Sequence, residues 1–183
     1  NPQLSRFLLS VQSEYNSEFR DIFLIALFTG ARKSNILSMR WDEIDLDHMT
    51  WTIPETKNGE ELLIPLFSDA NDILKQRRTY VDSDWVFPSN SKSGHIVEIK
   101  TGFKRVLDQA DIHDIRFHDL RRTFATILTS KNTPYFVIKH ALGHKVQDVT
   151  MVYARIDLAT HREAINLVGE HIRSCFMPTE YSQ

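Results

Sequence analysis

Two short stretches of the sequence place basic side chains where a phosphate group could be held. Thr29-Gly30 is typical of a helix end, so Arg32 is expected at an exposed corner beside the start of the next helix. Its guanidinium offers a planar fork of donors that suits a phosphate. An arginine at such a corner more often pairs with a surface carboxylate, so Arg32 alone indicates little.

The second stretch, residues 116–122, opens a predicted helix. His118 and Arg121 are three residues apart, which places them on one face near the positively polarised N-terminus of that helix. His113 and Arg116 have the same spacing. Because a chain with eight histidines forms such pairs by chance, we interpret His113 and Arg116 as a coincidence.

Three further residues could take part in acid–base or nucleophilic chemistry. Lys57 precedes Asn58-Gly59, and Asn-Gly between two β-type runs predicts a hairpin. His144 follows Leu142-Gly143 at a predicted helix end, and Tyr153 comes nine residues later. Taken singly, these residues have ordinary interpretations: an exposed lysine, a capping histidine and a half-buried tyrosine.

The elements that would position these residues are mostly helical. Apolar periodicity predicts helices over residues 4–14, 18–28, 34–40, 69–79, 97–109, 119–130, 134–141, 149–153 and 161–174. The second is apolar all round and is therefore expected at the centre, and the Ser34 hydroxyl is expected to cap the third. Residues 49–54, 62–65 and 85–87 predict three short antiparallel strands. The fold class is α+β, mostly helical with a small antiparallel three-stranded sheet.

The order of these motifs resembles the active site of the tyrosine recombinase family, to which phage-type integrases belong. Thr-Gly-x-Arg, a hairpin lysine, His-x-x-Arg, Leu-Gly-His and a tyrosine nine residues on follow one another over nearly the whole chain. Residues 117–123 and Tyr153-Ala154 match the family as well. The resemblance implies six catalytic residues: Arg32, Lys57, His118, Arg121, His144 and Tyr153. Residues 32–35 and 39–41 are similar to integrases of prophages and genomic islands.

The resemblance also implies a mechanism. Tyr153 would attack a DNA phosphodiester and form a 3′-phosphotyrosine, with His118 as the base and Lys57 protonating the 5′-oxygen. Arg32, Arg121 and His144 would stabilise the charge on the non-bridging oxygens. With so many cationic donors, no metal ion and no cofactor is expected.

Two departures from the family are visible. Asn35 stands where an acidic residue often follows the first arginine, and an asparagine can accept a hydrogen bond from Arg32 but cannot neutralise it. A small helical domain that clamps DNA usually precedes the catalytic domain. We interpret residues 1–183 as the catalytic domain alone, with that N-terminal domain absent from this chain.

The resemblance implies double-stranded DNA as the partner and a homotetramer on DNA, because two duplexes are cut four times. Alone, the chain is expected to be a monomer or weak oligomer. In relatives a segment beyond the tyrosine packs on a neighbouring subunit, and here residues 160–176 correspond to it. The alternative, that this helix packs on its own domain, is equally open.

Bulk composition fits an ordinary globular chain, with 42% hydrophobic and 25% charged residues. The single Cys175 excludes an intrachain disulfide, and a reducing cytoplasm, bacterial or phage-infected, fits best. The longest apolar run, residues 22–28, is too short to cross a membrane. The net charge of −2 argues against a general basic surface, so DNA binding would need a local one. Basic residues do recur at positions 100, 104, 105, 116, 121, 122 and 131, with aspartates between them.

Other functions remain open at this point. A type IB topoisomerase shares the same chemistry. A metal-dependent nuclease could use Glu55-x-Lys57 with Asp42, Asp45 or Asp47, although Lys57 falls at a hairpin tip rather than within a strand. A zinc site at His140 and His144 is dismissed, because it lacks a glutamate at position 141 and Gly143 interrupts the helix. An inactive DNA-binding module would make Tyr153 merely structural.

Overall fold

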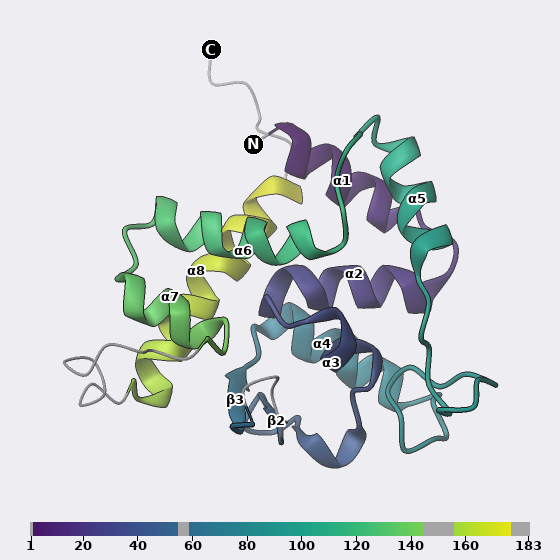
Figure 1. Ribbon diagram of the computed structural model, residues 1–183, viewed down its shortest axis with the longest axis horizontal. Helices are drawn as coiled ribbons and strands as arrows, with labels where there is room; N and C mark the ends of the chain where they lie inside the picture. Colours follow the sequence, from purple (N-terminus) through teal and green to yellow (C-terminus); the bar gives the residue numbers. More distant parts are fainter. Residues whose placement is uncertain (1, 55–58, 145–155, 177–183) are drawn as a thin grey trace.

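The computed structural model, which describes residues 2–54, 59–144 and 156–176, is mostly helical, with a small sheet at one edge (Figure 1). The helices are α1 (Pro2–Gln12), α2 (Ser17–Thr29), α3 (Lys33–Leu37), α4 (Ser68–Arg78), α5 (Lys100–Gln109), α6 (His118–Ser130), α7 (Tyr135–Ala141) and α8 (Leu158–Phe176). A 3₁₀ turn (Trp41–Glu43) precedes strands β1 (Ile44–Asp45), β2 (Thr50–Ile53) and β3 (Leu62–Pro65). The predicted fold class, α+β and mostly helical with three antiparallel strands, is confirmed.

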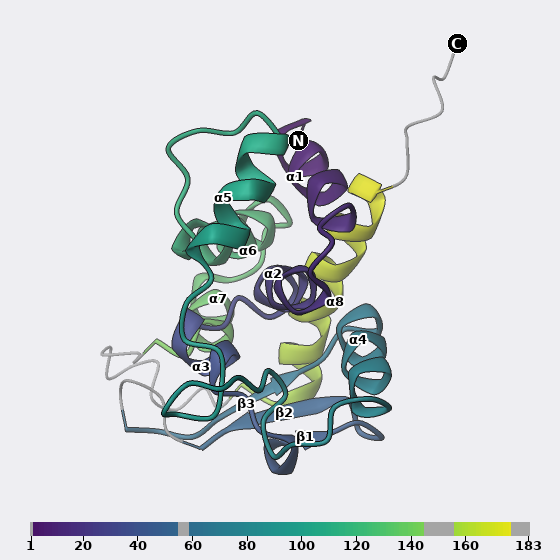
Figure 2. The ribbon, with the colours of Figure 1, turned by 90° about the vertical axis from the view of Figure 1, so that its right-hand side faces the viewer.

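Helix α2 forms the centre of the molecule, as its all-round apolar pattern predicts. Every residue from Asp21 to Thr29 is buried, and α1, α4, α6 and α8 contact the helix (Figure 2). The Asn16 side chain caps its start by accepting hydrogen bonds from the Glu18 and Phe19 amides at 2.9 and 3.0 Å. Gly30 ends it in the left-handed conformation, with φ of 61°. Helix α2 and its glycine cap therefore fix the position of the chain just before Arg32.

The sheet has the order β1-β2-β3, with Trp51 opposite Ile44 on one side and Ile64 on the other. The expected third strand at residues 85–87 is wrong. Trp85 forms an isolated bridge with Arg40, and the Val86 amide donates to the Met39 carbonyl at 2.9 Å, so this segment pairs with a loop outside the sheet. The third strand is instead β1, two residues in an acidic stretch that carries little strand signal.

Two predicted helix starts also need correction. Helix α3 begins at Lys33 with Arg32 as its N-cap, so the Ser34 hydroxyl lies inside the helix and does not cap it. Helix α5 begins at Lys100 rather than at Val97. The Glu98 carboxylate accepts from the amides of Ile99 and Lys100 at 2.8 and 2.9 Å, which fixes the start of the helix there. The helix predicted at 149–153 lies outside the described residues.

Helix α8 packs on its own domain. Ala164, Ile165, Val168 and Ile172 are at most 2% exposed, and α8 contacts α1, α2, α6, α7 and β3. At Gly169 a Cβ atom would lie 2.2 Å from the Phe67 ring, so the helix lies tightly against the segment before α4. Of the two alternatives left open for residues 160–176, the structure shows the helix packed on its own domain, with its apolar face completing the core. None of the helices in residues 2–54, 59–144 and 156–176 has the length and apolarity needed to cross a membrane.

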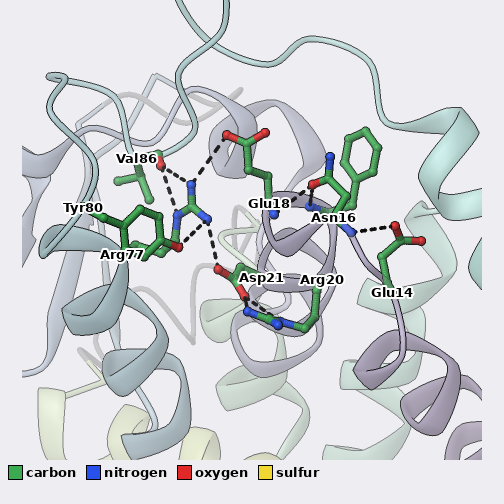
Figure 3. A network of polar contacts seen from close by, with 9 residues as sticks. Glu14, Asn16, Glu18, Arg20, Asp21, Arg77, Tyr80 and Val86 are labelled. Atoms are coloured by element: carbon green, nitrogen blue, oxygen red, sulfur yellow. Dashed lines mark hydrogen bonds and ion pairs between the residues drawn. The ribbon is translucent and has the colours of Figure 1, made fainter.

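A buried arginine joins α4 to α2 and to the segment at 85–87 (Figure 3). The Arg77 side chain is 1% exposed and donates to the Asp21 carboxylate at 3.0 Å. It also donates twice to the Val86 carbonyl, at 3.2 and 3.0 Å, and once to the Tyr80 hydroxyl at 3.3 Å. Its guanidinium lies over the Phe87 ring, 4.5 Å from the centroid. These bonds compensate for the loss of water around a buried charge.

Removal of Asp21 tests this network. Asp21→Ala removes the nearer and more buried of the two carboxylates beside Arg77 and leaves only Glu18 at 3.8 Å, so we expect a loss of about 3 kcal/mol in the free energy of unfolding. Asp108→Ala is the control, because it removes the exposed carboxylate that pairs with Lys104 and should change the stability far less. Denaturant unfolding of both variants measures the difference. Equal effects would show that the buried pair contributes no more than an exposed one.

Candidate active site

The Arg121 guanidinium joins the C-terminal ends of two helices. It is 7% exposed and donates to the Gly30 carbonyl at 2.6 Å and to the Leu142 carbonyl. Gly30 is the C-cap of α2 and Leu142 that of α7. Terminal helix carbonyls lack partners within their own helix and carry the negative end of its dipole, so both favour a cation. Arg121 therefore holds α2, α6 and α7 together at one point.

Gly30 allows this approach. Its φ of 61° is strained for any side chain, and a Cβ atom there would lie 2.7 Å from the Phe124 ring. Phe124 is on α6, one turn after Arg121, and is fully buried. The Thr29 hydroxyl donates to the Ile25 carbonyl at 2.7 Å and accepts from the Ala31 amide at 3.2 Å. The Thr-Gly sequence thus fixes the turn that leads to Arg32.

Arg32 lies close enough to Arg121 for their charges to interact. Burial, and then the charge of Arg32, lower the pKa of Arg121 to about 10, which leaves it protonated at neutral pH. Among the described residues no carboxylate pairs with Arg32, whereas the adjacent Lys33 pairs with Glu98 at 3.6 Å. The two arginines thus form a positive centre without an acidic partner in the described part of the chain.

His144 is hydrogen-bonded to Arg121, with Nη2 and Nε2 3.0 Å apart. A guanidinium only donates, so Nε2 accepts. Burial lowers the pKa of His144, and the charges of Arg121, Lys139, Arg32 and His118 lower it further. The ring is therefore neutral at neutral pH and carries its proton on Nδ1.

Four of the six expected site residues are thus brought together. Arg32, Arg121 and His118 all act on the pKa of His144, and His118 is exposed at the first position of α6. Their elements are the α2–α3 junction, α6 and the end of α7. Lys57 and Tyr153 lie outside the described residues, as does Glu55 of the nuclease alternative. The roles of all six residues remain predictions.

The structure separates the two His-x-x-Arg pairs. Arg121 is buried against helix carbonyls, whereas Arg116 is exposed and His113 faces Asp111 at 3.2 Å.

Within residues 2–54, 59–144 and 156–176, no three His, Cys, Asp or Glu side chains gather as metal ligands do. Asp45 and Asp42, possible ligands in the nuclease alternative, are bonded to His48 at 2.7 Å and to Arg40 at 3.1 Å.

The recurring basic residues at positions 100–131 form a mixed-charge surface more than a basic patch. Several of them pair with carboxylates at 2.5 to 3.6 Å: Lys104 with Asp108, Arg105 with Glu14, Arg122 with Asp119 and Lys100 with Glu98. Most of this surface is therefore of mixed charge.

Lys139 on α7, whose charge lowers the pKa of His144, was not singled out in the sequence analysis. Its position one turn before Leu-Gly-His could have indicated this.

Comparison with known proteins identifies the family. The model of the phage integrase family matches residues 3–159. The chain belongs to the phage integrase family. It is similar to the prophage integrase IntF of Escherichia coli K12, with 33% identity over 148 residues, which cover 78% of the chain and 32% of that protein. It is 29% identical over 174 residues to the integrase of Salmonella phage P22, covering 87% of the chain and 43% of that integrase. The chain thus spans less than half the length of these relatives.

Solved integrase and recombinase structures share the fold. The integrase from mycobacterium phage Brujita matches with a TM-score of 0.73 and 18% identity, over 95% of this chain and 62% of that one. The XerH site-specific recombinase in a pre-cleavage complex with its difH substrate matches with a TM-score of 0.66 and 23% identity, over 90% of this chain and 52% of that one. This member of the phage integrase family therefore has the fold that the resemblance implied.

Alanine substitutions at two separate glycines test how closely α2 and α6 approach each other. Gly30→Ala should destabilise the chain by about 1 kcal/mol for the left-handed backbone and by at least about 1 kcal/mol more for the clash with Phe124. Gly59→Ala is the matched control, since Gly59 has φ of 74° but nothing within 4 Å of its Cβ position. Thermal unfolding compares the two. A Gly30→Ala variant no less stable than Gly59→Ala would contradict the close packing.

Proposed function

We propose that this chain cuts and rejoins double-stranded DNA in site-specific recombination, with Tyr153 as the nucleophile. The observation that carries the proposal is the positive centre of Arg32 and Arg121, which has no carboxylate partner among the described residues and lies beside a neutral His144. Such a centre suits the anionic, five-coordinate phosphorus of phosphoryl transfer. DNA-bound structures of XerH and of lambda integrase, which share the fold, support DNA as the substrate.

Each proposed role follows from the chemistry of the side chain. The Tyr153 oxygen forms a bond to phosphorus while the bond to the 5′-oxygen breaks, and the phosphodiester energy is kept in the 3′-phosphotyrosine. The exposed His118 takes the phenol proton, and Lys57 gives a proton to the leaving 5′-oxygen. Arg32 and Arg121 stabilise the non-bridging oxygens, and His144 donates from Nδ1, because Arg121 occupies Nε2. The reverse sequence of steps rejoins the strand.

The larger protein and its assembly are also proposals. We take this chain as the catalytic domain of a longer recombinase, since its relatives extend well beyond the matched region. Recombination of two duplexes requires four cleavages, so four protomers would act together on DNA, and the chain alone would be a monomer or weak oligomer. Because the apolar face of α8 is buried in its own core, that face is not proposed as a contact between protomers.

The nucleophile is tested by trapping it. With nicked suicide duplexes of randomised sequence, the chain should form a covalent protein–DNA adduct that resists EDTA, because no metal is needed. Tyr153→Phe should abolish the adduct and leave DNA binding largely intact, since it removes one hydroxyl. Denaturing gels and peptide mapping of the adduct provide the measurement. An adduct on Tyr135 or Tyr181, or loss of cleavage in EDTA, would overturn the assignment.

The role of Arg121 is tested by Arg121→Lys, which keeps the positive charge but loses the planar set of N–H donors of the guanidinium. A lysine cannot hold two carbonyls and His144 while facing a phosphate, so the cleavage rate should fall by about 100-fold. Arg116→Lys is the matched control on the exposed arginine of the other pair and should cleave normally. Single-turnover cleavage gives the rates, and thermal unfolding confirms that the variants are folded. Similar losses in both variants would mean that the wrong pair had been chosen.

A further inference from the structure

One buried histidine takes no part in the proposed reaction. His161, in the first turn of α8, is 1% exposed, and its Nε2 atom has no hydrogen-bond partner among the described residues. Burial is the main cause that lowers its pKa to about 3, so the ring is neutral at any physiological pH. A neutral imidazole carries one proton, which must then be on Nδ1 or Nε2.

Within the described part of the chain, the His161 ring is hydrogen-bonded to the backbone of Leu63 in strand β3. Because Nε2 has no partner there, we assign Nδ1 as the donor to the Leu63 carbonyl. Strand β3 lies at the edge of the sheet, where a carbonyl that faces away from β2 needs a partner. The next residue, Arg162, donates to the His48 carbonyl at 3.0 Å. The first turn of α8 is therefore bonded to the backbone around the sheet at two points.

His161 also contacts α7. Its ring meets that of His140 edge to face, with centroids 5.0 Å apart and planes at 77°. An apolar side chain of similar size would pack here without leaving a buried nitrogen unsatisfied, which ordinarily costs a protein stability. A histidine at this position is therefore better explained by what its directed hydrogen bond fixes than by stability.

Each element that His161 touches leads to a residue of the proposed reaction. Leu62, at the start of β3, is five residues after Lys57, and His140 is four residues before His144. Helix α8 begins at Leu158, five residues after Tyr153. We propose that His161 is a positioning residue, whose bond to Leu63 and ring contact with His140 fix where the chain enters β3, leaves α7 and enters α8. This inference rests on the proposed function.

Two substitutions separate the hydrogen bond from the filling of space. His161→Asn keeps an N–H close to the position of Nδ1, whereas His161→Leu fills the site without a donor. We expect His161→Leu to form the covalent adduct at least about tenfold more slowly at nearly unchanged DNA affinity, because small misplacements of reacting groups are costly. His161→Asn should recover most of the rate. His171→Leu, on the same helix but away from the site, is the control and should cleave normally.

Hydrogen exchange gives a readout that does not depend on cleavage. Amides of residues 62–65 and 138–144 should exchange faster in His161→Leu than in the wild type, and His161→Asn should restore their protection. Unchanged exchange and cleavage in His161→Leu would overturn the proposal. So would a His161→Asn variant as slow as His161→Leu at equal melting temperature. If the wild-type chain forms no adduct, the proposed function fails, and the exchange comparison still decides whether His161 positions these elements. Should His161→Leu not fold, His161→Phe, which also fills the site without a donor, replaces it in the same two measurements.

Discussion

The contact between Arg121 and two helix-end carbonyls is the constraint on which the candidate site depends. A cation that is 7% exposed must find acceptors in place of water, and the ends of α2 and α7 supply them. The positions of the residues around Arg121 follow from this contact. Gly30 must lack a side chain so that α2 can meet α6 at Phe124. Arg32 follows Gly30 by two residues and His144 follows Leu142 by two, so the same contact that satisfies Arg121 brings both of them beside it.

The two buried arginines are stabilised in different ways, and the difference separates structure from chemistry. Both donate to backbone carbonyls. Arg77 also has the Asp21 carboxylate at 3.0 Å, so its charge is balanced inside the fold. Arg121 has carbonyls and a neutral histidine, and no carboxylate among the described residues. Carbonyl dipoles fix a guanidinium in place without cancelling its charge, so Arg121 stays available to an incoming anion.

Strong local signals made much of the fold predictable from the sequence. The all-round apolar pattern of α2 and the glycine at its end gave both its central position and the turn before Arg32. The predictions failed where tertiary contacts override local pattern. Residues 85–87 look like a strand, but their backbone groups are taken by Met39 and Arg77. Residues 44–45 do not look like a strand, yet β2 pairs with them. The apolar face of α8 was visible, but no spacing could tell whether that face would meet its own core or a neighbouring chain.

The candidate site, like the fold, could be predicted from the sequence only in part. Motif order singled out the pair His118 and Arg121, but spacing could not reveal that Arg121 is buried while Arg116 is exposed. Nor could it reveal that most of the recurring basic residues are paired with carboxylates. With a net charge of −2, the proposed DNA substrate would therefore have to be recognised at a local positive centre. Salt-bridged lysines release few counterions when they approach DNA, so they add little to affinity. Arg32 and Arg121, beside His144, concentrate positive charge where the proposed reaction would place a phosphate, which favours that reaction over general binding to DNA. In the longer recombinase proposed above, affinity for DNA would come from other parts of the protein, and this domain would act on one phosphate.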